Sequence, residues 1–308
     1  MEMLSTRAAY GKALAELGEK YDFYVFDADL AEATKTGSFK KAFPERFFDM
    51  GIAEGDMMSM AAGMSTCGKP VFASTFAVFA AGRAFEQVRN AICYNNLNVK
   101  IGATHGGILI GEDGGSHQSI EDVSLMRTLP NMKVIVPADA IEAKYAVEAA
   151  LKINGPVYLR FGRYDVPVFN TNEDYKFELG KANVLKEGKD VTVIAMGDMV
   201  YESLKAAEEL EKEGISVGVI NMHTIKPIDK EAIANALKNS KHIITAEDHN
   251  VYGGLYSAVC EVVAEIGGKL SGRIAVEDRF GQSGNRPALQ KEYGLCSENV
   301  VKTIKGIL

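Results

Sequence analysis

The sequence contains no tryptophan, only four cysteines, and no long apolar run. The cysteines, at 67, 93, 260 and 296, are scattered, and no two of them form a CxxC pair. Isolated cysteines are typical of reduced thiols in a cytosolic protein, whereas disulfide frameworks and zinc sites show paired spacings. No run approaches the ~18 apolar residues of a membrane span, and the N-terminus lacks a signal-peptide pattern. We therefore expect a cytoplasmic protein with no membrane partner.

Clustered positive charge and several common catalytic motifs are also missing. The 308 residues carry a formal net charge of −7, whereas nucleic-acid surfaces gather lysine and arginine. There is no GxxxxGK[ST] phosphate loop, no HExxH zinc motif, no GxGxxG after a strand and no GxSxG elbow. We expect no nucleic-acid partner and no metal ligands in this chain.

The sequence does contain a regular alternation of apolar strands and helices. In the first half, strands are predicted at 22–29, 47–50, 70–74, 99–104, 133–137 and 157–160. Helices are predicted at 6–20, from 54 onward, at 83–95 and at 140–152, and the polar stretch 35–47 is predicted to be a connection. Continuous apolar strands separated by helices indicate a parallel sheet covered on both faces.

The alternation resumes in the second half. Strands are predicted at 191–197, 216–220, 242–247 and 273–276, with helices at 200–212, at 230–237 and up to 266. We therefore predict an α/β protein of two domains, each a mainly parallel sheet covered by helices. The first domain is expected over 1–165 and the second, smaller one over 189–308, joined by a linker over 166–188.

Two short stretches are the first candidates for a site. Glu54 follows Gly51-Ile52-Ala53 and begins a segment rich in small residues and methionine, with the character of a helix. A carboxylate in the first turn of a helix commonly complements the exposed N–H groups and the helix dipole, so a purely structural role is the alternative. The second stretch contains Phe76 and Phe79, two aromatic residues three apart that could line a site. Packing in the domain core is the alternative role for both.

A glycine-rich loop is the more specific signal. It runs from His105 to Gln118 and contains Glu112, Asp113 and a second histidine, His117, twelve residues after the first. Glycine lets a backbone approach a ligand closely, and histidine donates or accepts protons near neutral pH. Together these groups fit one polar small molecule. One alternative is a loop that satisfies its own polar groups. A metal site is another, but the spacing of the two histidines matches no common zinc pattern.

Taken together, these pieces resemble the C-terminal half of transketolase. The matching motifs are Gly51-Ile52-Ala53-Glu54, Ser74-Thr75-Phe76-x-x-Phe79 and Thr104-His105…Gly111-Glu112-Asp113-Gly114-x-x-His117-Gln118. The resemblance covers essentially the whole chain: the domain that binds the pyrimidine of thiamine diphosphate, and the smaller C-terminal domain. It implies transfer of a two-carbon ketol unit from a ketose phosphate to an aldose phosphate, as in the pentose phosphate pathway.

The resemblance also implies which residues bind the cofactor. Glu54 would hydrogen-bond the pyrimidine ring nitrogen, which requires a carboxyl that holds a proton, and burial among Phe and Met favours that form. Phe76 and Phe79 would pack on the pyrimidine. Asp29 and Ile52 would lie near the cofactor, although an Asp at a strand end also fits a capping role.

The implied substrate residues come from four segments. His105 would lie near the sugar-phosphate end and His117 near the hydroxyls at the reacting carbon, so both are expected to be catalytic with Glu54. Asp113 would contact the C2 hydroxyl of the acceptor. Two arginines, at 7 and 163, would hold the phosphate, a task that suits a planar guanidinium, whereas a solvated surface position is their alternative.

One part of the family is missing from this sequence. The N-terminal domain of a full-length transketolase has a Gly-Asp-Gly motif that holds the metal and the diphosphate, and Gly197-Asp198 lies in the wrong domain to match it. We expect the C-terminal subunit of a split transketolase, in an α2β2 heterotetramer with an N-terminal subunit. That partner would hold Mg²⁺ or Ca²⁺. The Met-rich segment 57–64 is a candidate contact, with domain core as its alternative.

Two other interpretations stay open. The chain resembles, more distantly, the matching parts of deoxyxylulose-phosphate synthase and of the 2-oxoacid dehydrogenase β subunit, but His105 and the Gly-Glu-Asp-Gly-x-x-His-Gln string favour transketolase. The other interpretation is a non-catalytic scaffold that binds a partner. The joint presence of five polar candidates argues against it: Glu54, His105, Asp113, His117 and Arg163. The sequence departs from the family at Ala33, where a serine is usual beside the two arginines, so the preferred sugar is open.

Overall fold

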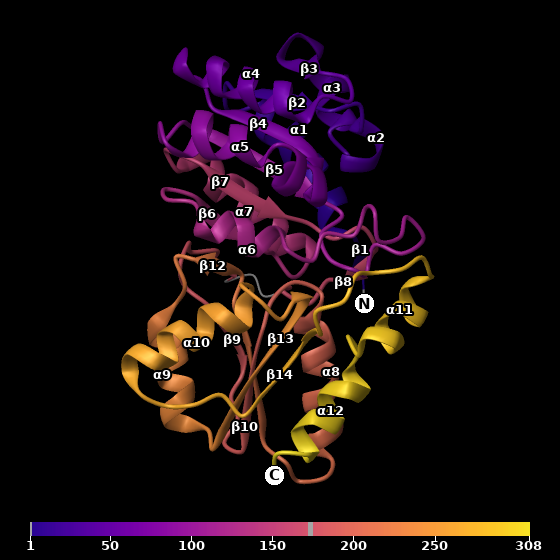
Figure 1. The fold of residues 1–308 in the computed structure, drawn as a ribbon, viewed down its shortest axis with the longest axis vertical. Coiled ribbons are helices and arrows are strands. Elements are labelled where there is room, and N and C mark those ends of the chain that lie inside the picture. Colours follow the sequence, from indigo (N-terminus) through magenta and orange to yellow (C-terminus); the bar gives the residue numbers. More distant parts are fainter. Residues whose placement is uncertain (1, 172–174) are drawn as a thin grey trace.

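The computed structural model describes residues 2–171 and 175–308. Met1 and residues 172–174, the latter within the expected linker, lie outside the described residues. The described chain contains two large sheets, one above the other in Figure 1. A small antiparallel pair between them joins β1 (Met3–Leu4) to β8 (Val166–Pro167).

The first domain is built around a sheet in the order β12-β6-β7-β5-β4-β2-β3. Its parallel strands are β2 (Tyr24–Asp27), β3 (Phe47–Asp49), β4 (Val71–Phe76), β5 (Val99–Thr104), β6 (Lys133–Ile135) and β7 (Val157–Arg160). β4 and β5 are buried along their whole length, because helices cover both faces of this sheet.

Each face of the first sheet has its own apolar layer. One layer contains α1 (Thr6–Gly18), α3 (Gly37–Ala42) and α7 (Ala140–Lys152). The other contains α4 (Glu54–Thr66), α6 (Asp122–Thr128) and two π-helical segments, η2 (Phe79–Arg83) and η3 (Val88–Cys93), with the short α5 (Phe85–Gln87) between them. The predicted helix over 83–95 therefore corresponds to α5 and η3, and η2 ends at its first residue, Arg83.

The stretch 35–47 is more ordered than the prediction of a polar connection. After α2 (Ala31–Thr34), it contains α3 and the 3-10 segment η1 (Pro44–Arg46). Phe39 is fully buried in α3 and stacks on Phe23, with ring centroids 5.1 Å apart. Phe43 also packs on Phe39, and Phe47 is buried in the same apolar cluster, so aromatic side chains order a segment whose composition is mostly polar.

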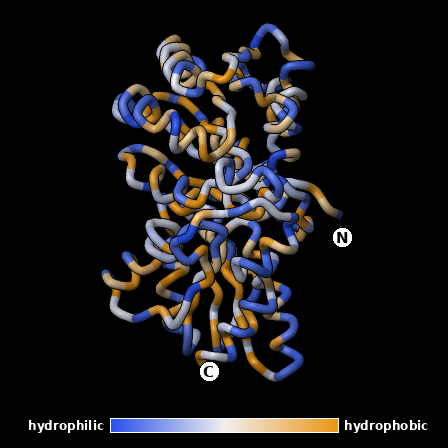
Figure 2. The backbone as a smooth tube through the Cα atoms, turned by 45° about the vertical axis from the view of Figure 1, so that its right-hand side comes forward, coloured by the Kyte–Doolittle hydropathy of each residue, from blue (hydrophilic) through white to orange (hydrophobic). Residues whose placement is uncertain are grey.

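The second domain has the sheet order β14-β13-β10-β11-β9. Its strands are β9 (Asn183–Lys186), β10 (Val191–Ala195), β11 (Val217–Asn221), β13 (His242–Asn250) and β14 (Gly272–Val276), and only β9 is antiparallel within this described sheet. α8 (Met199–Glu211) and α12 (Ser297–Lys305) lie on one side, and α9 (Lys230–Asn239) and α10 (Leu255–Ile266) on the other (Figure 1). The central strands are the hydrophobic part of this domain in Figure 2. α11 (Arg286–Tyr293) precedes α12.

The two domains are joined by more than a connecting segment. β12 (Thr224–Lys226) leaves the second half of the chain and pairs antiparallel with β6 of the first sheet. One apolar cluster contains Val134 of β6 as well as Ile220 and Met222 from the second half. The stretch 166–188, expected to be a linker, contributes β8 and β9 to sheets. The two domains therefore pack through a common apolar core.

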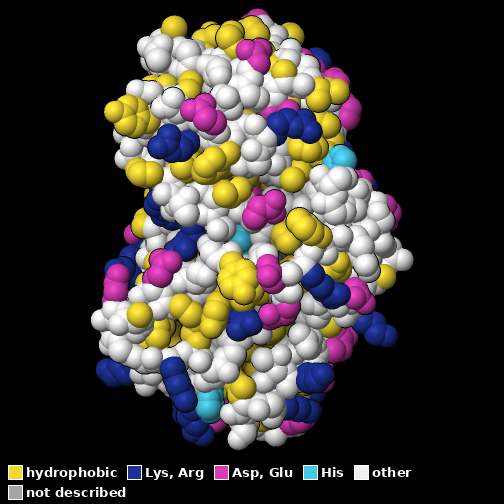
Figure 3. Space-filling view, in the orientation of Figure 1, with side chains coloured by type: hydrophobic (Ala, Val, Ile, Leu, Met, Phe, Trp, Pro, Cys, Tyr) yellow, Lys and Arg dark blue, Asp and Glu magenta, His cyan; other side chains and the backbone are white. Residues whose placement is uncertain are grey.

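The surface of the described chain shows no separation of charge on the face drawn in Figure 3. Acidic and basic side chains are interspersed there, among apolar ones. In residues 2–171 and 175–308, no helix has the length and apolar character needed to cross a membrane.

Candidate active site

The candidate site lies where β4 and β5 end. These strands are parallel neighbours with Phe76 opposite Thr104, so the segments that follow them begin side by side. His105 comes directly after β5 in a left-handed conformation, with φ of 59°. Its ring lies against Phe76, with the ring centroids 3.8 Å apart. The two strand ends therefore bring an aromatic ring and an imidazole into contact.

His105 is held in one tautomer. Its Nε2 lies 3.4 Å from Nη1 of Arg7, and its Nδ1 lies 2.9 Å from Oγ1 of Thr104. Because a guanidinium only donates, Nε2 accepts and Nδ1 carries the proton. Burial, reinforced by the charges of Arg7 and Arg163, lowers the pKa of His105 to about 3. The imidazole is therefore neutral at physiological pH.

Two arginines stand beside this imidazole. Arg7 donates from Nη1 to the carbonyl of Ala33 at 2.8 Å and from Nε to the carbonyl of Arg163 at 2.9 Å. Arg163 donates to the carbonyl of Ile110 at 2.6 Å and forms an ion pair with Asp113 at 3.2 Å. Burial and the charge of Arg163 lower the pKa of Arg7, which still remains a cation near neutral pH. The two guanidinium groups are thus fixed close together by backbone carbonyls.

These side chains line a pocket of about 360 Å³. Its lining residues are Arg7, Ala33, Phe76, His105, Asp113, His117 and Arg163. Paired guanidinium groups suit a phosphate, and the histidines and the carboxylate suit the hydroxyl groups of a polar ligand. The structure therefore brings together all five side chains predicted for substrate binding, from segments far apart in the sequence.

Glu54 begins α4 and is 1% exposed. Nη1 of Arg83 donates to both carboxyl oxygens, at 2.9 Å each. Sequence reasoning expected burial among Phe and Met and missed Arg83, which comes from a different element. Only the position of Arg83, four residues after the second aromatic candidate Phe79, could have drawn attention to it. The Arg83 guanidinium lies over the Phe79 ring, 4.1 Å from the ring centroid.

The aromatic candidates connect Glu54 to the pocket. Phe79 stacks on Phe76, with centroids 5.8 Å apart and an interplanar angle of 14°. His117 presents its ring edge to both, at 6.1 Å from Phe76 and 5.4 Å from Phe79. A continuous row of contacts thus runs from the buried carboxylate, through Arg83 and the two phenylalanines, to the two histidines.

Two predicted cofactor residues lie outside this row. Asp29 is exposed, with φ of 62°, and lines a separate hollow that shares only Ala33 with the pocket. Ile52 is 76% exposed and does not line the pocket. The acid that caps the segment after β2 is Asp27, which lies at the strand end but was not among the predicted site residues. Its buried carboxylate accepts hydrogen bonds from Thr34 and from the backbone N–H of Leu30, and burial raises the pKa of Asp27 to about 6.

The Met-rich segment divides between the core and the surface. Met57 and Met58 are fully buried in the layer beneath α4, whereas Met60 is 50% exposed. Met57 and Met58 are therefore part of the domain core, which was the alternative to a partner contact. Only the exposed side of α4 remains a candidate contact.

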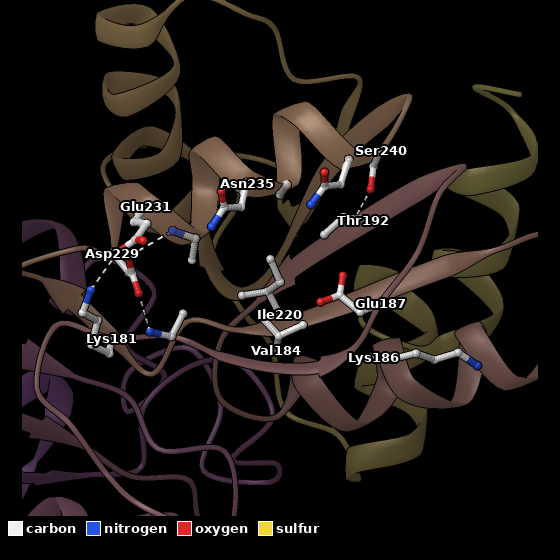
Figure 4. Close-up of a pocket in the computed structure, with 14 residues that line it drawn as sticks. Lys181, Val184, Lys186, Glu187, Thr192, Ile220, Asp229, Glu231, Asn235 and Ser240 are labelled. Carbon is white, nitrogen blue, oxygen red and sulfur yellow. Dashed lines mark hydrogen bonds and ion pairs between the residues drawn. The ribbon is translucent and has the colours of Figure 1, made fainter.

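A second pocket, of about 320 Å³, lies in the second domain (Figure 4). Some of its polar groups bind one another: Lys181 pairs with Glu231 at 3.1 Å, and Thr192 lies 2.6 Å from the hydroxyl of Ser240. None of the predicted site residues lines it. Among the residues that the structure describes, no group of three or more His, Cys, Asp or Glu side chains could hold a metal ion.

Comparisons with known proteins agree along the whole chain. The model of the transketolase pyrimidine-binding domain matches residues 2–168, and that of the transketolase C-terminal domain matches residues 180–300. A Methanocaldococcus jannaschii protein, provisionally named a transketolase C-terminal section, is 48% identical over 97% of this chain and 94% of its own length. Transketolase of Rattus norvegicus is 38% identical over 100% of this chain, which spans 49% of that protein.

A solved structure extends the similarity to three dimensions. It is a split-gene transketolase, described as an inactive β4 tetramer. It superposes with a TM-score of 0.91 at 52% identity, and the match covers 99% of this chain and 98% of that one.

Proposed function

The chain belongs to the transketolase family, and on that premise we propose that it is the C-terminal subunit of a thiamine-diphosphate-dependent transketolase. With a separate N-terminal subunit, it would transfer a two-carbon ketol unit from a ketose phosphate to an aldose phosphate. The observation that carries this proposal is the pocket in which two arginines, two histidines and Asp113 meet beside the Phe76 ring.

The residues of this chain fit the pyrimidine end of thiamine diphosphate. A buried carboxylate, on Glu54, and two stacked aromatic rings, on Phe76 and Phe79, form a continuous set of contacts. When bound, the cofactor supplies a nucleophilic carbon. Glu54 would hydrogen-bond a nitrogen of the ring, and the phenylalanines would orient the ring and exclude water. Asp29 and Ile52, which lie outside this row of contacts, stay proposed cofactor residues.

The substrate would bind in the neighbouring pocket. Arg7 and Arg163 would hold the phosphate, which suits a pair of guanidinium groups. His105, neutral and fixed by Thr104, and His117 would bond the sugar hydroxyls and move protons at the reacting carbon. Asp113 would contact the acceptor hydroxyl. Ala33 offers no hydroxyl here, so the guanidinium groups would carry the phosphate recognition.

The assembly and setting are part of the same proposal. We place the pyrimidine-binding domain at 1–165 and the C-terminal domain at 189–308, with 166–188 between them. The partner would be an N-terminal subunit in an α2β2 complex that holds Mg²⁺ or Ca²⁺ with the diphosphate, in the cytoplasm and in pentose phosphate metabolism. The 49% coverage of the rat enzyme and the similarity to a split-gene transketolase support a partner subunit.

The test compares two reactions in one assembly of this chain with the N-terminal polypeptide from the same source. Ketol transfer from xylulose 5-phosphate to ribose 5-phosphate is measured beside carbon dioxide release from pyruvate. We expect transfer without release. Release from pyruvate without transfer would instead indicate the deoxyxylulose-phosphate synthase or 2-oxoacid dehydrogenase type.

A further inference from the structure

The loop 106–118 carries two of the pocket side chains, Asp113 and His117, yet has no helix or strand of its own. Three of its glycines, at 107, 111 and 114, have φ between 73° and 91°. Glycine populates such angles readily, so the local sequence permits many backbone shapes here. The single shape that forms the pocket must therefore be imposed by neighbouring parts of the molecule.

The strongest of these neighbours is Asp248, on β13 of the second domain. Its carboxylate oxygens accept hydrogen bonds from the backbone N–H groups of Ile108 at 2.9 Å and of Leu109 at 3.0 Å. Asp248 is 5% exposed, and a Cβ added to Gly107 would overlap its carboxylate. The loop backbone is thus fitted against a buried acid that comes from the other domain.

Asp248 is itself fixed by the first domain. Arg160, at the end of β7, donates to the backbone carbonyl of Asp248 at 3.0 Å and to the buried carboxylate of Asp122 at 2.8 Å. Burial raises the pKa of Asp248 to about 6, and the Arg160 charge and the two loop N–H groups oppose that rise. The carboxylate is therefore ionised at pH 8, the form that accepts both hydrogen bonds.

The far end of the loop also contacts the second domain. The side chain of Gln118 donates to the carbonyl of Gln282 at 3.0 Å. The backbone N–H of Asn250, two residues after Asp248, donates to the carbonyl of Ile120 at 2.8 Å. The second domain thus holds both ends of the segment that carries the pocket side chains.

We propose that Asp248 is a positioning residue: from the second domain it fixes the glycine-rich loop and thereby places Asp113 and His117 in the pocket. The inference rests on the proposed function for its consequence in catalysis. It gives the second domain, which supplies no side chain to the pocket, a direct part in shaping it.

The test substitutes Asp248→Asn, which keeps the size of the side chain but turns an N–H₂ group toward a loop N–H. Hydrogen exchange is measured on the full chain. We expect the amides of 106–118 to exchange at least ten-fold faster, with little change in β4 and β5. In the assembly with the N-terminal subunit, we expect kcat/KM for the sugar phosphates to fall at least ten-fold. The concentration of thiamine diphosphate that half-saturates the enzyme should change less than two-fold.

The matched control is Asp139→Asn. Asp139 is an equally buried aspartate whose carboxylate accepts from three backbone N–H groups, those of Glu142, Phe169 and Asn170, away from the loop. A purely structural role predicts the same outcome for both variants: lower stability, with unchanged loop exchange and kcat/KM. That result for Asp248→Asn would overturn the inference.

A second variant and the choice of sample cover the two ways in which this experiment could fail. If Asp248→Asn does not fold, Gly107→Ala perturbs the same contact from the loop side and should give the same local rise in exchange; a loop that stays protected overturns the inference. Exchange is measured on this chain alone, so it tests the loop contact even if the wild-type assembly lacks ketol transfer. That lack would count against the proposed function, not against the contact.

Discussion

At the scale of single residues, the pair formed by Glu54 and Arg83 has the greatest chemical consequence. The carboxylate is buried, whereas the side chain of Arg83 is 49% exposed. A buried carboxylate left alone would be costly, and the guanidinium removes that cost in the isolated chain. A pyrimidine nitrogen that hydrogen-bonds Glu54 would therefore share the carboxylate with the Arg83 guanidinium.

Replacing Glu54 with Gln should separate its role in catalysis from its role in the fold. Gln keeps the shape but cannot exchange a proton with the ring nitrogen, so turnover of the assembly should fall by about 10²-fold or more. The free energy of unfolding should change by only about 1 kcal/mol, because the half-exposed Arg83 can be hydrated. Steady-state kinetics and urea unfolding measure the two effects.

The matched control is Glu202→Gln. Glu202 is a buried glutamate that accepts a hydrogen bond from the Ser297 backbone N–H at 2.9 Å, far from the pocket. Its replacement should leave turnover unchanged. Near-normal turnover in Glu54→Gln would show that the role assigned to Glu54 is wrong.

His105 gives a prediction about pH. In the unfolded chain it binds a proton below about 6.5, whereas in the folded protein burial lowers its pKa to about 3. Between these values the unfolded state holds one proton more, so the stability that His105 confers is complete above the upper value and is lost as the pH falls. Denaturant unfolding gives the free energy of unfolding of wild type and of His105→Asn at each pH between 7 and 4. Plotted against pH, this free energy should fall more steeply for wild type, by up to about 1.4 kcal/mol per pH unit. Parallel curves would contradict the assignment.

Arg163 tests the phosphate contact. Its removal takes away a charged hydrogen-bond donor, so Arg163→Ala should raise KM for phosphorylated sugars by about 10-fold to 100-fold. KM for the unphosphorylated sugars should change little. Arg279→Ala removes a surface arginine paired with Glu292 and should have no effect on either. An equal loss on both kinds of sugar in Arg163→Ala would argue against a phosphate contact.

At the scale of elements, the packing of α1 on β5 sets the distance between Arg7 and His105. Tyr10 of α1 is fully buried against Phe161, with ring centroids 4.7 Å apart, and its hydroxyl lies 2.6 Å from that of Ser74. Gly102 of β5 faces this ring, and a Cβ there would overlap the Tyr10 hydroxyl. Because both ends of the tyrosine are held, the helix itself must shift if that space is filled.

Gly102→Ala should therefore destabilise the protein by about 1–3 kcal/mol through overpacking. Gly63→Ala is the control: Gly63 lies within α4 and has no neighbouring atom within 4 Å of an added Cβ, so the change should stabilise by about 0.4–1 kcal/mol. Urea unfolding of both variants measures the difference. Equal effects of the two substitutions would contradict the close approach of α1 to β5.

Elements also show what sequence patterns can predict. β4 and β5 were predictable because a short, continuous apolar run fits few structures other than a buried strand. The glycine-rich loop directly follows β5. The pair of Glu54 with Arg83 was not, because it joins two elements 29 residues apart and no spacing rule connects them. Asp27 is the last residue of β2 and Asp29 follows two residues later, and only the three-dimensional direction of each side chain separates the buried acid from the exposed one.

At the scale of the whole molecule, the two-domain α/β fold follows from the alternation of strands and helices. The connections between the domains do not follow from it. β12 crosses to the first sheet, and Asp248 reaches the loop from the second, because long-range pairing depends on tertiary packing and not on local pattern. The pocket is thus a product of both domains, although its lining comes from the first.

This chain is proposed to be one half of a transketolase, and the decisive measurement is ketol transfer from xylulose 5-phosphate to ribose 5-phosphate. It is made with thiamine diphosphate and magnesium, first with this chain alone and then with the N-terminal polypeptide from the same source. We predict activity only in the mixture. Activity of this chain alone would contradict the division of the site between two subunits, and a mixture that stays inactive would contradict the assigned reaction.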